Sequence, residues 1–255
     1  MSIRDIKFNI DPNSKTPLWL QIKNELFDCL EKEVLKPGQL MPNEKTLVEL
    51  FNVSIGTVRK AIGVLENEGI LIRKQGLGTF VCQHDDHSFL FKYFHIVHHD
   101  SDERHIPEVE CVSFELKDAS DKEIDVLNIP KENNKVISIY NKLAFQGKVH
   151  SADKIVISAA KFPLLNEEIF INRHNTVYNL YQNKFNVFIA KCSERVRAIP
   201  APVNVAKMLG IKANSPILKI SRVGFTYHDE AVELRTSYVN TSEIEYIRQQ
   251  YSTVG

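Results

Sequence analysis

The sequence has few of the features that mark specialised classes of protein. Its four cysteines (Cys29, Cys82, Cys111 and Cys192) are far apart and form no Cys-x-x-Cys pair, which argues against a disulfide framework or a zinc knuckle. No apolar run approaches the roughly 18 residues of a membrane span, and none follows Met1. These absences predict a soluble cytoplasmic protein with no membrane partner, no cofactor and no metal site.

An excess of charge of one sign is also missing. The 255 residues include 32 Lys and Arg and 32 Asp and Glu, so the formal net charge is zero. Any contact with nucleic acid must therefore come from locally placed charge. The length and the 43% hydrophobic content predict two modest globular domains.

The first eighty residues read as three short helices followed by a strand pair. After a polar arm at 1–14, Thr16 is expected to cap the first helix with Pro17 at its first position. Asn43 and Ser54 are expected to cap the second and third helices, and the third ends near Gly69. In the third helix, one face is apolar (Val58, Ala61, Ile62, Leu65) and the opposite face is small or basic (Gly56, Arg59, Lys60, Gly63). That second face suits close approach to a polyanion.

The stretch RKQGLGTFV at 73–81 puts two cations and a glutamine before a Gly-x-Gly. A dinucleotide loop would need a third glycine and a following helix, and neither is present. The flanking segments instead read as two strands joined at a hairpin tip. A basic hairpin beside a helix-turn-helix predicts a wing that contacts a DNA backbone or minor groove.

This N-terminal region, about 15–83, resembles the winged helix-turn-helix of GntR-type bacterial transcription regulators. The motifs that carry the resemblance are LKPGQLMPNEKTLVELFNVSIGTVRKAI, ENEGIL and RKQGLGTFV. The family usually has Arg where Ile55 stands, and Ile can only touch a thymine methyl or pack inward. The resemblance and the basic faces together predict DNA contacts from Lys45, Ser54, Ile55, Gly56, Thr57, Arg59, Lys60, Arg73, Lys74, Gln75, Gly76, Gly78 and Thr79.

The domain boundaries expected are 1–83 for the DNA-binding domain, 84–88 for a polar linker and 89–255 for a second domain. Strands are expected at 89–97, 109–117, 135–146, 148–158, 187–199, 216–228 and 231–240, with helices from Ser120, near 176–184 and at 203–209. Consecutive strands with short turns predict an antiparallel sheet with helices on one face, an α+β fold. Two hairpins look alike, and each would project a carboxylate (Asp153 or Glu233) from a matching position; chance similarity of hairpins explains them equally well.

This second region, about 89–247, resembles the UTRA domain, the effector-binding module of the HutC subfamily of GntR regulators, with a chorismate-lyase-like fold. The segments VAKMLGIKANSPILKISR and AVEL carry the resemblance. It implies an effector site at Asn141, Leu143, Asp153, Thr176, Tyr178, Glu233 and Val239. Relatives that bind sugar phosphates often have arginines at the first two positions, and here strand alternation points Lys142 to the opposite face. A neutral or cationic ligand, such as a sugar or an amine, is therefore as consistent with these residues as a phosphorylated one.

Two alternatives remain open. Six of the nine histidines lie in 84–105 and could bind zinc or nickel in a metal-responsive regulator, although an ordinary polar linker is favoured. An enzyme of lyase-like fold is conceivable, but the sequence shows no nucleophile motif and no arginine pair for a dicarboxylate substrate. The favoured interpretation is a homodimeric transcription regulator, most simply a repressor. It would bind a palindromic double-stranded DNA operator, be released by a small-molecule effector and have no enzymatic activity.

Overall fold

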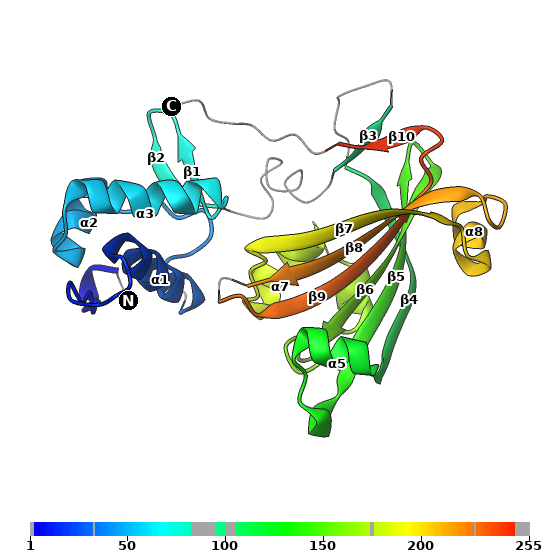
Figure 1. Cartoon of the computed structure of the whole chain (residues 1–255), viewed down its shortest axis with the longest axis horizontal. Helices are drawn as coiled ribbons and strands as arrows, with labels where there is room; N and C mark the ends of the chain where they lie inside the picture. Colours follow the sequence, from blue (N-terminus) through cyan, green and yellow to red (C-terminus); the bar gives the residue numbers. More distant parts are fainter. Residues whose placement is uncertain are drawn as a thin grey trace. The chain divides into compact units, whose positions relative to one another are not determined.

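The computed structural model describes residues 3–32, 34–82, 95–99, 106–173, 176–226 and 228–247. The chain divides into two compact units, Met1–Phe89 and Leu90–Gly255, which are described separately below (Figure 1). The linker predicted at 84–88 lies outside the described residues, so its bounds stay a prediction.

The first unit is a helical bundle that carries a hairpin. Its elements are η1 (Ile3–Asp5), α1 (Leu18–Glu31), α2 (Glu44–Phe51), α3 (Ile55–Asn67), β1 (Leu71–Lys74) and β2 (Gly78–Val81). Helix α3 packs against both α1 and α2, and the predicted inward face of α3 is buried throughout. The N-terminal arm joins this core, because the Phe8 ring contacts the Phe51 ring with 4.5 Å between their centroids.

The helix starts follow the predicted caps in two of three cases. The side chain of Asn43 accepts a hydrogen bond from the Thr46 amide, and Ser54 accepts one from Thr57. The expected Thr16 cap is wrong: Pro17 is the N-cap and α1 begins at Leu18. The Gln21 side chain of α1 reaches back and donates to the Thr16 carbonyl at 2.8 Å. This turn is therefore held by Gln21 and not by the Thr16 hydroxyl.

The predicted wing is confirmed as a hairpin. Strands β1 and β2 pair antiparallel, with Arg73 opposite Thr79. The chain at 38–41 runs along β2 and extends this small sheet: the Met41 amide donates to the Thr79 carbonyl at 2.8 Å. Gly76 and Gly78 have φ of +74° and +112°, which L side chains rarely adopt, so glycine is required at both positions.

The second unit is built on one antiparallel sheet of six strands, in the order β4-β5-β6-β9-β8-β7 (Figure 1). The strands are β4 (Glu108–Asp118), β5 (Lys135–Phe145), β6 (Lys148–Ser158), β7 (Lys191–Pro200), β8 (Pro216–Phe225) and β9 (Ala231–Val239). The two similar hairpins, β5-β6 and β8-β9, meet through the β6-β9 pair at the centre. A separate ribbon pairs β3 (Ile96–His98) with β10 (Ile244–Tyr246).

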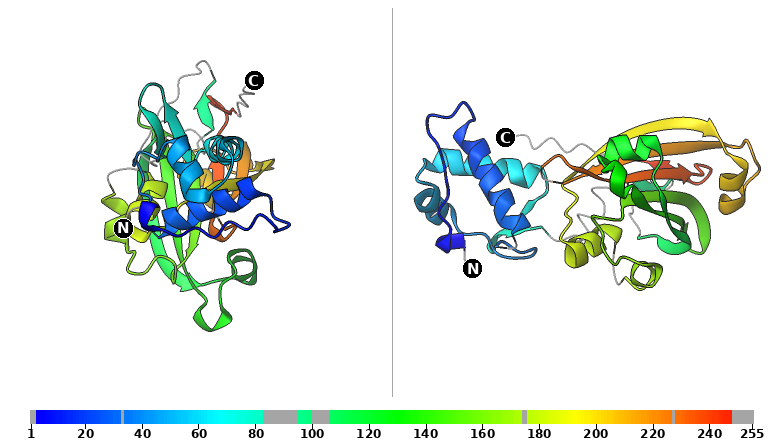
Figure 2. Two further views of the ribbon diagram at one scale, coloured as in Figure 1. Left: turned by 90° about the vertical axis from the view of Figure 1, so that its left-hand side faces the viewer. Right: turned by 90° about the horizontal axis from the view of Figure 1, so that it is seen from below.

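Helices cover both faces of this sheet, so the prediction of one covered face is wrong. Helices α5 (Asp121–Leu127) and α8 (Val203–Leu209) pack on the face that holds Ala152 and Val156. Helices α6 (Glu167–Ile171) and α7 (Val177–Phe185) lie on the other side, where Tyr178 and Tyr181 reach Glu233 (Figures 1 and 2). The physical reason is visible in β6, which is buried at almost every position and therefore needs cover on both sides.

Most of the other predicted elements are present. Ser120 and Glu123 form the expected capping box at the start of α5, and Gly210 ends α8 with φ of +65°. Helix α6 and the 3₁₀ turn η2 (Lys131–Asn133) were not predicted, because each is too short to show a period. The strand expected at 89–97 falls largely outside the described residues, and the part that is described pairs with β10 and not with the main sheet.

Candidate DNA-binding surface and effector cavity

The outward face of α3 carries the residues predicted to meet DNA. Arg59 is exposed, and its Nε donates to Glu44 Oε2 of α2 at 2.8 Å, which fixes the guanidinium on this face. The Lys60 ammonium lies 4.9 Å from the centre of the Trp19 ring of α1. Lys60 is therefore directed toward α1, and contact with a phosphate would require it to leave the ring.

The N-terminal turn of α3 presents an apolar side chain outward. Ile55 is 43% exposed, so it does not pack inward, which was one of its two predicted placements. Ser54 and Gly56 beside it are exposed as well, and the Ser54 hydroxyl is 2.9 Å from that of Thr57. An exposed isoleucine flanked by small residues can be approached closely by the edge of a base.

The wing adds a second exposed basic strip. Arg73 pairs with Glu66 of α3 at 3.2 Å, and the Lys74 ammonium lies 5.1 Å from the centre of the Phe80 ring. A Cβ at Gly78 would stand 2.8 Å from Leu40 Cδ1, so the exposed Leu40 side chain would have to shift to admit it. The remaining predicted contacts are exposed, apart from the half-buried Thr79, and comprise Lys45, Gln75 and Gly76.

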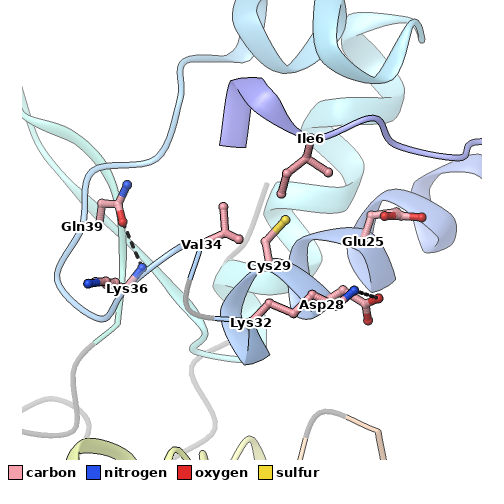
Figure 3. A pocket seen from close by; sticks show the side chains of 8 residues that line it. All are labelled: Ile6, Glu25, Asp28, Cys29, Lys32, Val34, Lys36 and Gln39. Carbon is pink, nitrogen blue, oxygen red and sulfur yellow. Dashed lines mark hydrogen bonds and ion pairs between the residues drawn. The ribbon is translucent and has the colours of Figure 1, made fainter. Parts of the chain in front are cut away.

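A hollow in this unit lies between the end of α1 and the segment after it (Figure 3). Lys32 pairs with Asp28 here at 3.1 Å, and the Gln39 side chain accepts from the Lys36 amide at 2.9 Å. Burial raises the pKa of Cys29 to about 11, so its thiol stays protonated near neutral pH. The predicted effector residues lie in the other unit.

The predicted effector residues gather on the α7-covered face of the large sheet. Strand register sets Asn141 beside Asp153 and Asp153 beside Ser237, and in the next row Leu143 beside Ser151 and Ser151 beside Val239. Asp153 and Glu233 lie on this same face, as expected. Asp153 pairs with Ser237 and Glu233 with Ile157, so the two acids lie symmetrically about the Ile155–Arg235 pair, at equivalent positions of β6 and β9.

Glu233 lies fully buried at the centre of a hydrogen-bonded cluster under α7. Its Oε1 accepts from the Tyr178 hydroxyl at 2.9 Å and its Oε2 from the Tyr181 hydroxyl at 2.9 Å. Arg235 completes the set, with Nε and Nη2 each 3.0 Å from a Glu233 oxygen. Both carboxylate oxygens are thus occupied by protein donors, and Glu233 positions Arg235 instead of facing the cavity directly.

A second buried ion pair lies next to the first. Arg222 stands opposite Arg235 in the β8-β9 register, and its Nε is 2.6 Å from Glu194 Oε1. The Tyr246 hydroxyl donates to Glu194 Oε2 at 2.7 Å, and His95 Nε2 is 3.9 Å from the same oxygen. Burial alone would raise the pKa of Glu194, but Arg222 and Tyr246 outweigh it and hold the pKa below its usual value.

These residues enclose a cavity of about 20 Å³, which holds about one water molecule. Two predicted residues, Leu143 and Asp153, line it. Its wall also includes residues that the sequence analysis missed, namely Ser151, Ile220, Arg222, Arg235 and Ser237 of the sheet, and His95, Ile96 and Tyr246 of the ribbon region. The conclusion that the chain lacks an arginine pair is therefore wrong: alternation places Arg222 and Arg235 side by side on this face.

Two neighbouring acceptors, Asp153 at the cavity and Asn141 beside it, differ in their partners. Asp153 Oδ2 is 3.6 Å from Arg235 Nη1, beyond hydrogen-bond distance, and burial raises the pKa of Asp153 despite Arg235 and a hydrogen bond from Ser237. Asn141 does not line the cavity but is only 2% exposed, and its Oδ1 accepts no hydrogen bond within the described part of the chain. A buried acceptor without a donor is costly, so Asn141 favours a ligand that brings a hydrogen-bond donor to this side of the cavity.

Two other predicted effector residues, Thr176 and Val239, lie outside the lining of the cavity. Thr176 caps α7, accepting from the Asn179 amide at 3.1 Å, and Val239 is buried in an apolar cluster with Ile96 and Ile244. Lys142 points to the opposite face, as predicted, and pairs with Glu110 at 3.5 Å. Thr176 and Val239 therefore shape the site without lining the cavity.

The histidine-rich segment shows no metal centre in the part that is described. There, no group of three or more His, Cys, Asp and Glu side chains is arranged to hold a metal ion. His98 and His99 stack on each other, 5.0 Å apart, while His84, His87 and His105 lie outside the described residues.

Comparison with protein families identifies both units. Residues 18–81 match the family "Bacterial regulatory proteins, gntR family", and residues 102–245 match the UTRA domain. The chain belongs to the GntR family. The combination of the two domains fits its HutC subfamily, so the chain binds DNA through the first unit and a small-molecule effector through the second. These assignments confirm a regulator and not an enzyme, and they do not favour a metal-responsive alternative.

Full-length relatives of this GntR-family regulator include transcriptional repressors. It is 28% identical over 92% of its length to a Shigella flexneri protein named "Probable fructoselysine utilization operon transcriptional repressor", of which it covers 95%. It is 24% identical to the "HTH-type transcriptional repressor NagR" of Bacillus subtilis, with 88% of this chain and 91% of that protein covered. A 47% identical match to the regulator YurK of Bacillus subtilis covers only 72 residues, 28% of this chain and 30% of YurK.

Solved structures support the fold. The ligand-binding domain of a putative GntR-family regulator from Bordetella bronchiseptica superposes with a TM-score of 0.58 at 21% identity, covering 62% of this chain and 98% of that one. The regulator YydK of Bacillus subtilis gives a TM-score of 0.54 at 17% identity over 91% of this chain and 99% of YydK. Across the described residues, no helix combines the length and the apolar character needed to span a membrane.

The cluster around Glu233 generates a stability prediction. Tyr181→Phe removes the hydroxyl that donates to Glu233 Oε2 and should lower the free energy of unfolding by about 1–3 kcal/mol. Urea denaturation followed by circular dichroism measures this change. Tyr140→Phe, at a half-buried ring stacked with Lys154, is the control and should change stability by less than about 0.5 kcal/mol. Equal losses in the two variants would contradict the assigned bond.

Proposed function

We propose that this chain is a cytoplasmic, homodimeric transcriptional repressor that leaves its operator when a small polar metabolite occupies the cavity around Asp153. The observation that carries the proposal is that one chain joins an exposed reading helix and wing to a closed, charged cavity. Two full-length relatives are named as repressors, which supports repression over activation.

DNA would be read by two copies of α3 on the half-sites of a palindrome. Arg59 and Ile55 face outward from α3 and would meet base edges in the major groove. The wing, with Arg73 and Gly76, would follow the flanking backbone or minor groove. The serine and amide groups at the N-terminus of α3 would bind a phosphate.

Effector binding requires the cavity to open, because about 20 Å³ admits no metabolite. His95, Ile96 and Tyr246 form the part of the wall that does not belong to the large sheet. Strand β3 is also the first described element after the DNA-binding unit. A ligand that displaces β3 would thus act directly on the chain that joins the two units and change the spacing of the two reading helices.

The proposal is tested by selecting a binding sequence from random duplexes and measuring its complex with the full-length protein. Two chains should bind each palindrome, and a metabolite panel should release the duplex, measured by fluorescence anisotropy. Sugars, amines, amino acids, sugar phosphates and fructoselysine make up the panel. One chain per duplex, or a complex insensitive to every class, would contradict the proposal.

The role of Arg59 gives a direct prediction. Arg59→Ala should weaken operator binding by about 1–3 kcal/mol and relax the preference at one base position, if Arg59 makes a bidentate base contact. Lys32→Ala is a matched control, because Lys32 also forms an exposed ion pair, at 3.1 Å with Asp28, away from α3. Operator affinity in the Arg59 variant equal to that of the control would show that α3 does not read bases through this residue.

Ile55 should read the methyl group of a thymine. Replacing that thymine with deoxyuridine removes only the methyl and should weaken binding by about 0.8 kcal/mol, roughly fourfold. In Ile55→Ala the same replacement should have no effect, because the apolar contact is already lost. Scanning deoxyuridine through the selected operator measures both. Equal penalties in wild type and variant would rule out the contact.

A further inference from the structure

The chemistry of the cavity narrows the class of effector, and this inference rests on the function proposed above. Within the described residues, the cluster holds three acids (Asp153, Glu194, Glu233), two arginines (Arg222, Arg235) and His95, whose Nε2 lies 3.9 Å from Glu194 Oε2. Charged groups of both signs are therefore in place before any ligand enters.

Charged groups of both signs suit a ligand that also carries both signs. A sugar phosphate would bring about two negative charges, and Asn141 and Leu143 offer no cation at the adjoining positions. A ligand that carries one charge of each sign adds no net charge to the buried cluster and can form a new ion pair with each kind of group.

The groups for the two charges are already arranged. Asp153 is the acid with the longer arginine contact, 3.6 Å, and the unpartnered Asn141 Oδ1 is its register neighbour on the same face. This is an acceptor pair suited to an ammonium group. Arg222 and Arg235 stand opposite each other, each held on one side by its glutamate, and their planar guanidinium groups suit a carboxylate.

We infer that the effector is a zwitterion, an amino acid or amino-acid conjugate with its ammonium on Asp153 and Asn141 and its carboxylate on Arg222 and Arg235. The carboxylate would share the arginines with Glu194 and Glu233. Tyr246 of β10 donates to Glu194, and Tyr178 and Tyr181 of α7 donate to Glu233. A ligand carboxylate that moves either glutamate would therefore also move β10 or α7.

The test uses the full-length protein on its selected operator and compares charge classes of probe. Amino acids with uncharged side chains are the zwitterions, putrescine is a cation, glucose 6-phosphate is an anion and glucose is neutral. A zwitterion should release the operator at the lowest concentration. Its N-acetyl derivative, which lacks the ammonium, and its carboxamide, which lacks the carboxylate, should each bind at least about tenfold more weakly.

Variants locate the contact. Asp153→Asn should raise the concentration of the active zwitterion needed for half release of the operator at least about tenfold. Asp118→Asn is the matched control, an exposed acid 2.8 Å from Lys135, and should leave effector binding unchanged. Asn141→Leu guards against misfolding of the first variant: it removes a buried acceptor without a donor, so it should keep the fold and still weaken the zwitterion.

Three results would overturn the inference. These are strongest release by glucose 6-phosphate, glucose or putrescine, equal binding of a zwitterion and its two blocked derivatives, and undiminished zwitterion binding in both Asp153→Asn and Asn141→Leu. Failure of the proposed function gives a different result, since no class of probe then releases the operator. Release by a zwitterion that depends on Asp153 supports both proposals.

Discussion

The second unit of this regulator depends on the buried pairing of Glu233 with Arg235. The two residues are two positions apart on β9, so both side chains reach the same face of the sheet, where Arg235 donates twice to Glu233 at 3.0 Å. Buried charges are tolerated only when their hydrogen bonds are satisfied, and Tyr178 and Tyr181 complete the set. The same bonds hold α7 against the sheet and direct Arg235 toward Asp153.

The two units recognise their partners by different physics. The DNA-binding residues are exposed, and their ion pairs, such as Arg59 with Glu44, are screened by water and salt. DNA binding through them should therefore depend strongly on ionic strength. The residues around the cavity are buried, so the charge and hydrogen-bond pattern of an effector would be read in a medium of low dielectric constant. A small ligand can then influence a much larger, solvated interface.

Local signals in the sequence were sufficient for most of the fold. The caps at Asn43, Ser54 and Ser120 and the glycines of the wing are short-range features, and each is where the sequence places it. Thr16 was misjudged because a side chain five residues away, Gln21, bonds its carbonyl. The sequence of β6, KVHSADKIVIS, mixes polar and apolar residues, so its burial on both sides, and with it the helices on both faces, could not be predicted from an apolar run.

The cavity was harder to predict because it depends on strand pairing. Asp153 and Leu143 were found through a family resemblance, whereas Arg222 and Arg235 were not recognised as a pair. They lie 13 positions apart and meet only in the β8-β9 register. One signal was present in the sequence: Glu233 and Arg235 are charged residues at alternate positions of a strand, a spacing that puts them on one face. Which face they share, and that Tyr178 and Tyr181 reach it, follows from tertiary packing alone.

The most direct test of the account is calorimetric titration of the full-length protein with the active metabolite and with operator duplex, in both orders. Coupling between two sites is reciprocal, so the factor by which the metabolite weakens operator binding must equal the factor by which operator weakens metabolite binding. The account predicts equal factors of at least about fivefold. A metabolite that binds the free protein and the operator complex with the same affinity would contradict it, because the cavity would then have no influence on DNA.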